Sequence, residues 1–380
     1  MVNKKNRSIS GIAQITLLIV IAFLILIGIS IWVLIKNKEK KNTEPYLPGD
    51  NFEYVAGTSL ENGLVIRDEN GNEYVWIEVP KSIYSNNEYN TDKKISDKKP
   101  KKSSDYEKIE YCLKKYTKAY RNHLYNDEYE DDSTEGWFKS EKEYNEAKNY
   151  MLKSIYENGG FYIGRYEAGI DSFRKSKDEE IVDIPVSQPN KFPYAYVTRT
   201  QAKNLAEMVE SGNCKSSLMF GLQWDLVLAF IQHNGGVSRY ELTRRSTNLG
   251  NYKNNIWNVQ NDEAKYYDYK TEWKSCPYEK NSVEEILLTT GASPEFAQMN
   301  IYDISGNEWE WTLERNKNTL TDTTEDLNAR LEEEKKSYPC VARGGSCGSD
   351  ATVIATNFRS GHNDIMYSSS AATFRVTLYK

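Results

Sequence analysis

The sequence is poor in the residues that build metal centres and disulfide frameworks. Its five cysteines are an odd number, and no two of them are spaced as Cys-x-x-Cys. This pattern is typical of neither a disulfide scaffold nor a zinc finger, so we expect isolated buried thiols. Only three histidines occur, far apart, which argues against a histidine-rich metal site. These residues are Cys112, Cys214, Cys276, Cys340, Cys347, His123, His233 and His362.

The chain also lacks short catalytic motifs. No G-x-S-x-G, Walker A or H-E-x-x-H sequence is present, so no common hydrolase, P-loop or zinc-protease chemistry is indicated. The first 41 residues hold seven of the 49 basic and one of the 55 acidic side chains, which leaves 42 against 54 and a net charge of −12 for the rest. So acidic a body is poorly suited to nucleic acid, and none is expected as a partner.

One long apolar run is present, at residues 12–35, where the only polar side chains are Gln14, Thr16 and Ser30. A helix of that length crosses a hydrocarbon core of roughly 30 Å, so we predict a transmembrane helix. The alternative is a cleaved signal peptide, but lysines follow the run at once and favour retention. A short basic N-terminus, residues 1–11, precedes the helix, and a linker, residues 36–50, follows it. Because both flanks are basic, charge does not set the orientation.

The remaining residues, 51–380, are predicted to form one enlarged α+β domain with a helical insertion near residues 81–150. Asn70-Gly71 lies between two apolar runs and predicts a hairpin turn. Capping signals predict helices from Ser140 to Gly159 and from Thr198 to about Glu210. Further helices are expected at residues 222–231 and 282–288, and a long surface loop at residues 239–268.

Three separated motifs carry a family resemblance. Residues 300–312 read NIYDISGNEWEWT, residues 343–346 read RGGS, and residues 373–376 read TFRV. Together they resemble the formylglycine-generating enzyme (sulfatase-modifying factor) family, whose signature contains G-N-x-W-E-W, R-G-G-S and G-F-R. The strand-like residues 161–169 and the segment 223–225 extend the resemblance, which covers about residues 52–376 except the insertion. It implies a C-type-lectin-like fold with irregular loops.

The first motif contains a candidate cation site. Asp303 and Glu310 bracket a tight turn, and two carboxylates with backbone carbonyls suit a hard cation. The resemblance implies calcium, bound by the side chains of Asp303 and Glu310 and by the carbonyls of Gly306 and Glu308. The alternative is an Asp-capped turn beside a solvated glutamate. Trp309 and the second tryptophan of the motif are expected in the core.

The cysteines argue against the family's catalysis. Its enzymes hold copper with two cysteines just beyond R-G-G-S, because thiolates suit copper(I). Here Cys347 directly follows the motif, no cysteine comes after it, and Cys340 precedes it. We therefore do not expect copper. Arg343 and Arg375 are predicted to form internal ion pairs.

These patterns favour a non-catalytic, lectin-like ligand-binding domain. It would be held to the cell membrane by the single helix at 12–35 and displayed outside the cell, to bind an extracellular protein or glycan. One alternative is a divergent oxidase of the family. Another is a hypervariable binding protein of a diversity-generating retroelement, because adaptable polar residues lie between R-G-G-S and the final motif. The predicted contact residues are Asn357, Arg359, His362, Asn363, Asp364 and Tyr367.

Overall fold

The structure is a computed structural model that describes residues 45–90, 100–129, 137–270, 272–316, 339–362, 364 and 366–380. The chain divides into two units, Met1–Tyr46 and Leu47–Lys380, and all elements below belong to the second. The predicted membrane helix at 12–35, the N-terminus 1–11 and most of the linker 36–50 lie outside the described residues. Among the residues that are described, no helix has both the length and the apolarity to cross a bilayer.

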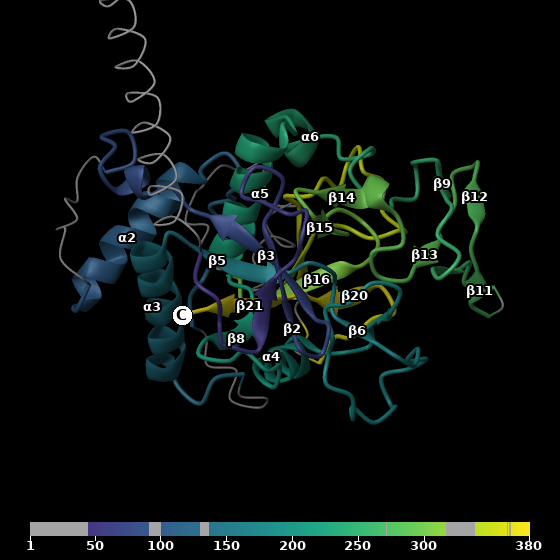
Figure 1. Ribbon diagram of the computed structural model, residues 1–380, viewed down its shortest axis with the longest axis horizontal. Coiled ribbons are helices and arrows are strands. Elements are labelled where there is room, and N and C mark those ends of the chain that lie inside the picture. The colour runs from purple at the N-terminus through teal and green to yellow at the C-terminus, as the bar shows by residue number, and fades with distance from the viewer. Residues whose placement is uncertain are drawn as a thin grey trace, which may run out of the picture. The chain divides into compact units, whose positions relative to one another are not determined.

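The largest sheet of the described residues has six strands, in the order β1-β2-β3-β5-β21-β8 (Figure 1). Every neighbouring pair is antiparallel, and the C-terminal strand lies between two strands from earlier in the chain. The predicted hairpin around Gly71 is confirmed as the β2–β3 connection. The strands are β1 Phe52–Tyr54, β2 Val65–Asp68, β3 Glu73–Glu78, β5 Gly160–Gly164, β8 Lys215–Leu218 and β21 Val376–Tyr379.

Five α-helices accompany this sheet in the described residues. Helices α2 and α3, which begin within the predicted insertion, pack against each other, and α3 contacts β5 and β21. The predicted N-cap at Ser140 and C-cap at Gly159 are confirmed for α3, and Thr198 caps α4 with Gln201. The helices are α2 Ser103–Tyr116, α3 Glu141–Asn158, α4 Arg199–Glu207, α5 Gly221–Gly235 and α6 Arg239–Thr243, with short 3-10 turns η1 Lys81–Tyr84 and η2 Pro294–Phe296.

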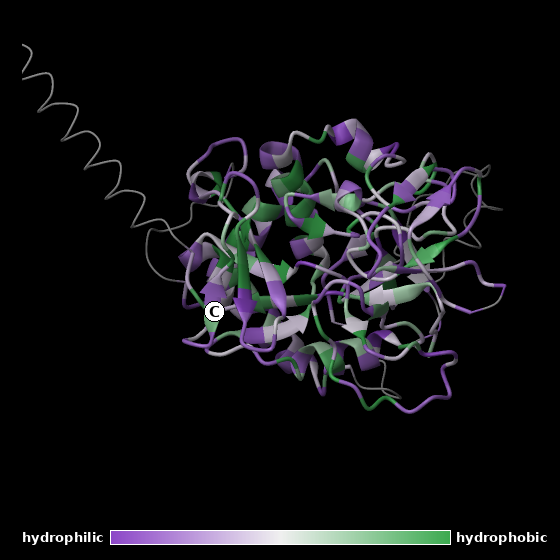
Figure 2. Cartoon of the chain, turned by 45° about the vertical axis from the view of Figure 1, so that its right-hand side comes forward, coloured by the Kyte–Doolittle hydropathy of each residue, from purple (hydrophilic) through white to green (hydrophobic). Residues whose placement is uncertain are grey.

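A four-stranded sheet, in the order β19-β18-β16-β20, carries the sequence motifs. Its strands are β16 Trp309–Thr312, β18 Cys340–Arg343, β19 Arg359–His362 and β20 Ala372–Phe374. The strand predicted around the two tryptophans is therefore confirmed as β16. Trp311 is buried as expected, whereas Trp309 is only half-buried. Hydrophobic residues concentrate inside the described body in Figure 2, in the central strands and in α5.

The remaining strands form small sheets around this core. They are β4 Tyr125–Asn126 with β17 Arg315–Asn316, β6 Gly169–Ile170 with β7 Phe192–Pro193, β9 Trp257–Val259 with β12 Tyr278–Lys280, β10 Lys265–Tyr267 with β11 Lys274–Ser275 and β13 Leu287–Leu288, and β14 Ala297–Gln298 with β15 Ile301–Tyr302. Few helices and many strands in small sheets make a mixed α and β fold, as the sequence predicts. The finer C-type-lectin-like assignment stays a prediction.

Two predicted elements are wrong. Residues 239–268 are not a surface loop, because they contain α6, β9 and β10 and bury Leu242, Tyr252 and Trp257. Residues 282–288 are not a helix, because Leu287 and Leu288 end the stretch as β13 against β10. Side-chain amides replace regular backbone pairing in this region. One example is the Asn307 Oδ1, which accepts a hydrogen bond from the Leu288 N–H at 3.1 Å.

Candidate functional site

A buried charge network lies beneath the C-terminal strands. Arg343 donates to Asp225 Oδ1 at 2.8 Å and to Glu314 Oε2 at 3.0 Å, which confirms the predicted internal ion pair. Arg359 on the next strand donates to the same two carboxylates, at 2.9 Å each. Arg121 from the insertion adds a third guanidinium, 3.2 Å from Asp225 Oδ2. The network therefore joins the insertion, helix α5 and strands β18 and β19 in one set of charge-assisted bonds.

This network changes the role of one predicted contact residue. Arg359 is only 7% exposed, and its guanidinium also donates to the Tyr120 carbonyl at 2.9 Å. Its N–H groups are thus used inside the protein. The structure places Arg359 as a residue that positions β19, and the same residue lines a cavity.

The other predicted contact residues lie nearer the surface. Asn357 is half-buried, Asp364 is exposed, and Asn363 falls outside the described residues. The His362 ring stacks on the Tyr367 ring, with centroids 4.1 Å apart. Burial lowers the pKa of His362 to about 4, so its ring is neutral at pH 7 and stacks as an uncharged aromatic group.

Exposed apolar side chains gather in the same part of the chain. Eleven large apolar side chains are exposed within the described residues, and four of them come from the segment 353–367, which we call the C-terminal face. Only Tyr367 is among the contact residues that the sequence predicts, because that prediction rests on polar residue types. The sequence signal for the other three is the presence of large apolar residues in a segment otherwise rich in polar and loop-forming residues. The four are Val353, Phe358, Met366 and Tyr367.

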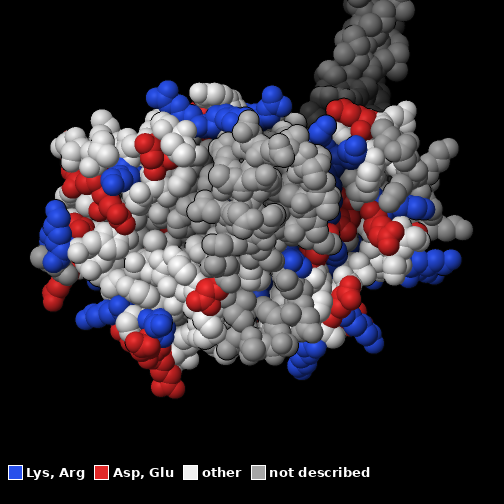
Figure 3. Space-filling view, turned by 180° about the vertical axis from the view of Figure 1, so that it is seen from behind, with Lys and Arg blue, Asp and Glu red and all other residues white. Residues whose placement is uncertain are grey.

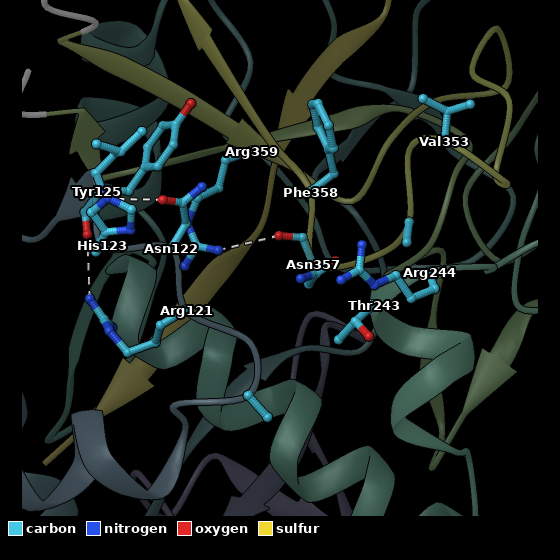
Figure 4. A pocket seen from close by; sticks show the side chains of 13 residues that line it. Arg121, Asn122, His123, Tyr125, Thr243, Arg244, Val353, Asn357, Phe358 and Arg359 are labelled. Atoms are coloured by element: carbon cyan, nitrogen blue, oxygen red, sulfur yellow. Dashed lines mark hydrogen bonds between the residues drawn. The ribbon is translucent and has the colours of Figure 1, made fainter. Parts of the chain in front are cut away.

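A cavity of about 630 Å³ opens beside the C-terminal face (Figure 4). Its walls come from three segments far apart in sequence, residues 119–125, 243–244 and 353–359. The first belongs to the insertion, which the sequence predicted only as packing. Strand pairing of β4 with β17 and the ion pair of Arg121 hold that wall in place. The site thus combines an apolar surface with an adjoining polar cavity.

The predicted calcium residues lie elsewhere, around a buried arginine. Glu310 is held by Arg375, whose Nε lies 3.0 Å from its Oε2, so the second predicted internal ion pair is confirmed. The Asp303 Oδ2 accepts a hydrogen bond from the Gly291 N–H at 2.7 Å. Burial raises the pKa of Asp303 to about 6, and it raises the pKa of Glu310 as well. Glu167, also fully buried, lies beside these two carboxyls.

The two predicted carbonyl ligands flank the turn. Gly306 has a φ of 74°, which fits the predicted turn, and its Cβ position would lie 2.3 Å from the Asn251 carbonyl oxygen. The Glu308 carboxyl is buried, and neither oxygen has a hydrogen-bond partner in the described residues. Within those residues, no group of three or more His, Cys, Asp or Glu side chains is arranged to hold a metal ion. Calcium binding stays a prediction.

Replacing Asp303 tests this loop through pH. A carboxyl whose pKa is raised on folding binds its proton more tightly in the folded state, so stability falls as pH rises from about 4 to about 6. Asp303→Asn keeps an oxygen acceptor and removes that ionisation. We expect the free energy of unfolding of this variant to exceed that of the wild type by on the order of 1–3 kcal/mol at pH 7, with no gain at pH 4.

The free energies of unfolding of the wild type and the variant are measured by urea unfolding at both pH values, with a calcium chelator present. Glu61→Gln, at an exposed carboxyl, is the control and should leave stability unchanged at either pH. Equal stability of Asp303→Asn and wild type at pH 7 would contradict the raised pKa. Repeating the series with excess calcium tests the predicted ion, which should stabilise the wild type more than the variant.

The cysteine that directly follows the R-G-G-S motif is enclosed by the protein, and the absence of copper stays a prediction. Cys347 is fully buried, and its Sγ lies 3.5 Å from the Tyr269 hydroxyl. Burial raises the pKa of this thiol, which disfavours the thiolate that a soft metal needs. Four of the five cysteines are buried, as predicted, and Cys214 is half-buried.

Comparison with protein-family profiles and with curated proteins gave no match. Among solved structures, Treponema denticola variable protein 1 is similar to 58% of this chain and is covered over 96% of its own length, with 15% sequence identity. The TM-score is 0.27, so this likeness carries no argument about fold or function. The resemblance to formylglycine-generating enzymes rests on the sequence motifs alone.

Proposed function

We propose that this protein binds a ligand through the C-terminal face, residues 353–367. The observation that carries the proposal is the exposure of four large apolar side chains in one short segment beside a cavity. Two of the four, Val353 and Phe358, line the same cavity, and exposed apolar surface beside polar groups marks interaction sites. Aromatic rings supply much contact area at low conformational entropy, and neighbouring amides supply adaptable hydrogen bonds.

The scaffold below this face is well suited to hold it. β19 pairs with β18 and is tied to the charge network through Arg359. At the other end of the face, β20 pairs with the central strand β16. Loops that are fixed at both ends by packed strands can carry binding residues without loss of fold stability.

The face also suits a hypervariable binding protein of a diversity-generating retroelement. The observation that favours this second candidate is that structural and exposed residues are separate within this segment. Arg359 is buried and bonded to Asp225, whereas Phe358, Met366 and Tyr367 are exposed. Exposed positions can change without disturbing the network. A reverse transcriptase gene with a template repeat near this gene is the expected finding, and its absence would remove this candidate.

The same proposal includes the anchor. Residues 12–35 would hold the chain in the cell membrane as a single span and present the C-terminal domain outside the cell to a protein or glycan. Added protease should then digest the domain on intact cells. Complete protection until the cells are lysed would contradict the outward orientation.

Variants of the face test the binding function. Peptide ligands would be selected from a random library on the full chain in detergent, and their affinity measured for a Phe358→Ser/Tyr367→Ser double variant. We expect binding to weaken by about 10–100-fold, because two exposed aromatic anchors are lost. The control is Val182→Ser/Ile184→Ser, which removes two exposed apolar side chains, each more exposed than Phe358 or Tyr367, from another loop. Ligands that are indifferent to the face, or equally sensitive to the control, would contradict the proposal.

A further inference from the structure

The cavity beside the C-terminal face has an unbalanced charge. Its described lining residues include three arginines and no aspartate or glutamate. Two of them, Arg121 and Arg359, are already bonded to buried carboxylates. Arg244 is exposed and has no ion pair or side-chain hydrogen bond within the described residues. One guanidinium is therefore left to meet a ligand.

The placement of Arg244 supports this role. It directly follows α6, and in Figure 4 its guanidinium points toward Asn357 across the cavity. Lys and Arg side chains also gather along the upper edge of Figure 3, the edge at which α6 lies in Figure 1. A concave site lined by charge of one sign concentrates ligands of the other sign.

The other lining groups fit a carboxylate next to an apolar group. Asn122 accepts from the Leu124 N–H through Oδ1, which leaves its amide N–H groups to donate. The side-chain amide of Asn357 makes no hydrogen bond in the described residues. Phe358 and Val353 add exposed apolar surface to the same cavity, and the two residues are 40% and 72% exposed.

We propose that this cavity binds an acidic peptide segment, in which a glutamate or aspartate carboxylate meets Arg244 and an adjoining apolar side chain packs on Phe358. The inference rests on the proposed function, because it names the ligand class of the same face. A guanidinium fork with amide N–H groups matches a carboxylate. The exposed phenyl ring favours an apolar side chain over a sugar acid, which presents mainly hydroxyls. A volume of about 630 Å³ lies in the usual range of small-ligand pockets.

The test uses the full chain in detergent and three probes, which are N-acetyl-Glu-Phe-amide, N-acetyl-Gln-Phe-amide and N-acetylneuraminic acid. Affinities are measured by ligand-observed NMR titration. We expect the glutamate peptide to bind about tenfold more tightly than its neutral isostere, because a charge-assisted hydrogen bond is lost in the isostere. That preference should disappear in Arg244→Gln and remain in Arg245→Gln, the adjacent exposed arginine outside the cavity lining.

Equal binding of the two peptides, or no binding of either, would overturn the inference. Tighter binding of N-acetylneuraminic acid than of the glutamate peptide would overturn the peptide class. A preference that survives in Arg244→Gln would place the carboxylate elsewhere. If library-selected ligands still depend on Phe358 and Tyr367 in any of these cases, the proposed function stands and only the ligand class falls. If they do not, both fall.

Discussion

Asp225→Asn is expected to lower the free energy of unfolding by about 3–5 kcal/mol, because it leaves buried guanidinium groups without a counter-charge. Asp225 is fully buried and accepts from Arg343, Arg359 and Arg121. Without its charge, Arg343 and Arg359 keep only Glu314 as a hydrogen-bonded carboxylate partner, and Arg121 keeps no such partner within the described residues. Breaking one member of such a set costs far more than an exposed pair contributes.

Urea unfolding followed by circular dichroism measures this loss. The control is Glu146→Gln, which breaks an ion pair of 3.8 Å whose two side chains are mostly exposed. It should change stability by less than about 0.5 kcal/mol. If Asp225→Asn gives no soluble folded protein, Arg121→Gln at the partly exposed edge of the network supplies a measurable, smaller loss. A loss from both network variants no larger than that of the control would contradict the structural role of the network.

Arg375→Gln is the second variant with a large expected effect, again about 3–5 kcal/mol. Arg375 is the cation among three buried carboxyls, Glu310, Glu167 and Asp303. Removing it leaves the Glu310 carboxylate without its hydrogen-bonded counter-charge in a buried site. The loss should shrink as pH falls toward 5, because the carboxyls then take up protons and no longer need a counter-charge.

A double-mutant cycle with Glu310→Gln separates this ion pair from general damage. If the pair acts as described, adding Arg375→Gln to Glu310→Gln should cost little further stability, because Glu310→Gln has already removed the carboxylate that Arg375 neutralises. The readout is the unfolding free energy of the two single variants and the double variant at pH 7. Simple additivity of the two losses, or a loss from Arg375→Gln that is independent of pH, would contradict this account.

The sequence predicts those elements whose signals are local. The caps at Ser140 and Thr198, the hairpin turn at Gly71 and the strand around Trp311 all depend on neighbouring residues, and all are confirmed. The arginine ion pairs were predicted as a type of contact, although their partners were not. Asp225 lies 118 residues from Arg343, so no local pattern connects them.

The sequence does not predict the regions in which side-chain hydrogen bonds between distant segments, rather than regular secondary structure, hold the backbone. Asn251 donates to the Ile286 carbonyl and to Asn307, and such bonds order a region that has no helical or strand period. The candidate site shows the same limit. The residue type of Arg359 predicts a contact residue, whereas its ion pairs with Asp225 and Glu314 show that it also positions β19. The cavity needs a wall from the insertion, which the sequence assigned only to packing.

The central claim is that the C-terminal face binds the ligand, and hydrogen–deuterium exchange of the full chain with a selected ligand tests it most directly. Exchange reports which backbone amides become protected on binding. Protection is expected in residues 353–362 and 119–125, with no change in residues 265–280. Protection that leaves residues 353–362 unchanged and appears in another part of the chain would contradict the claim.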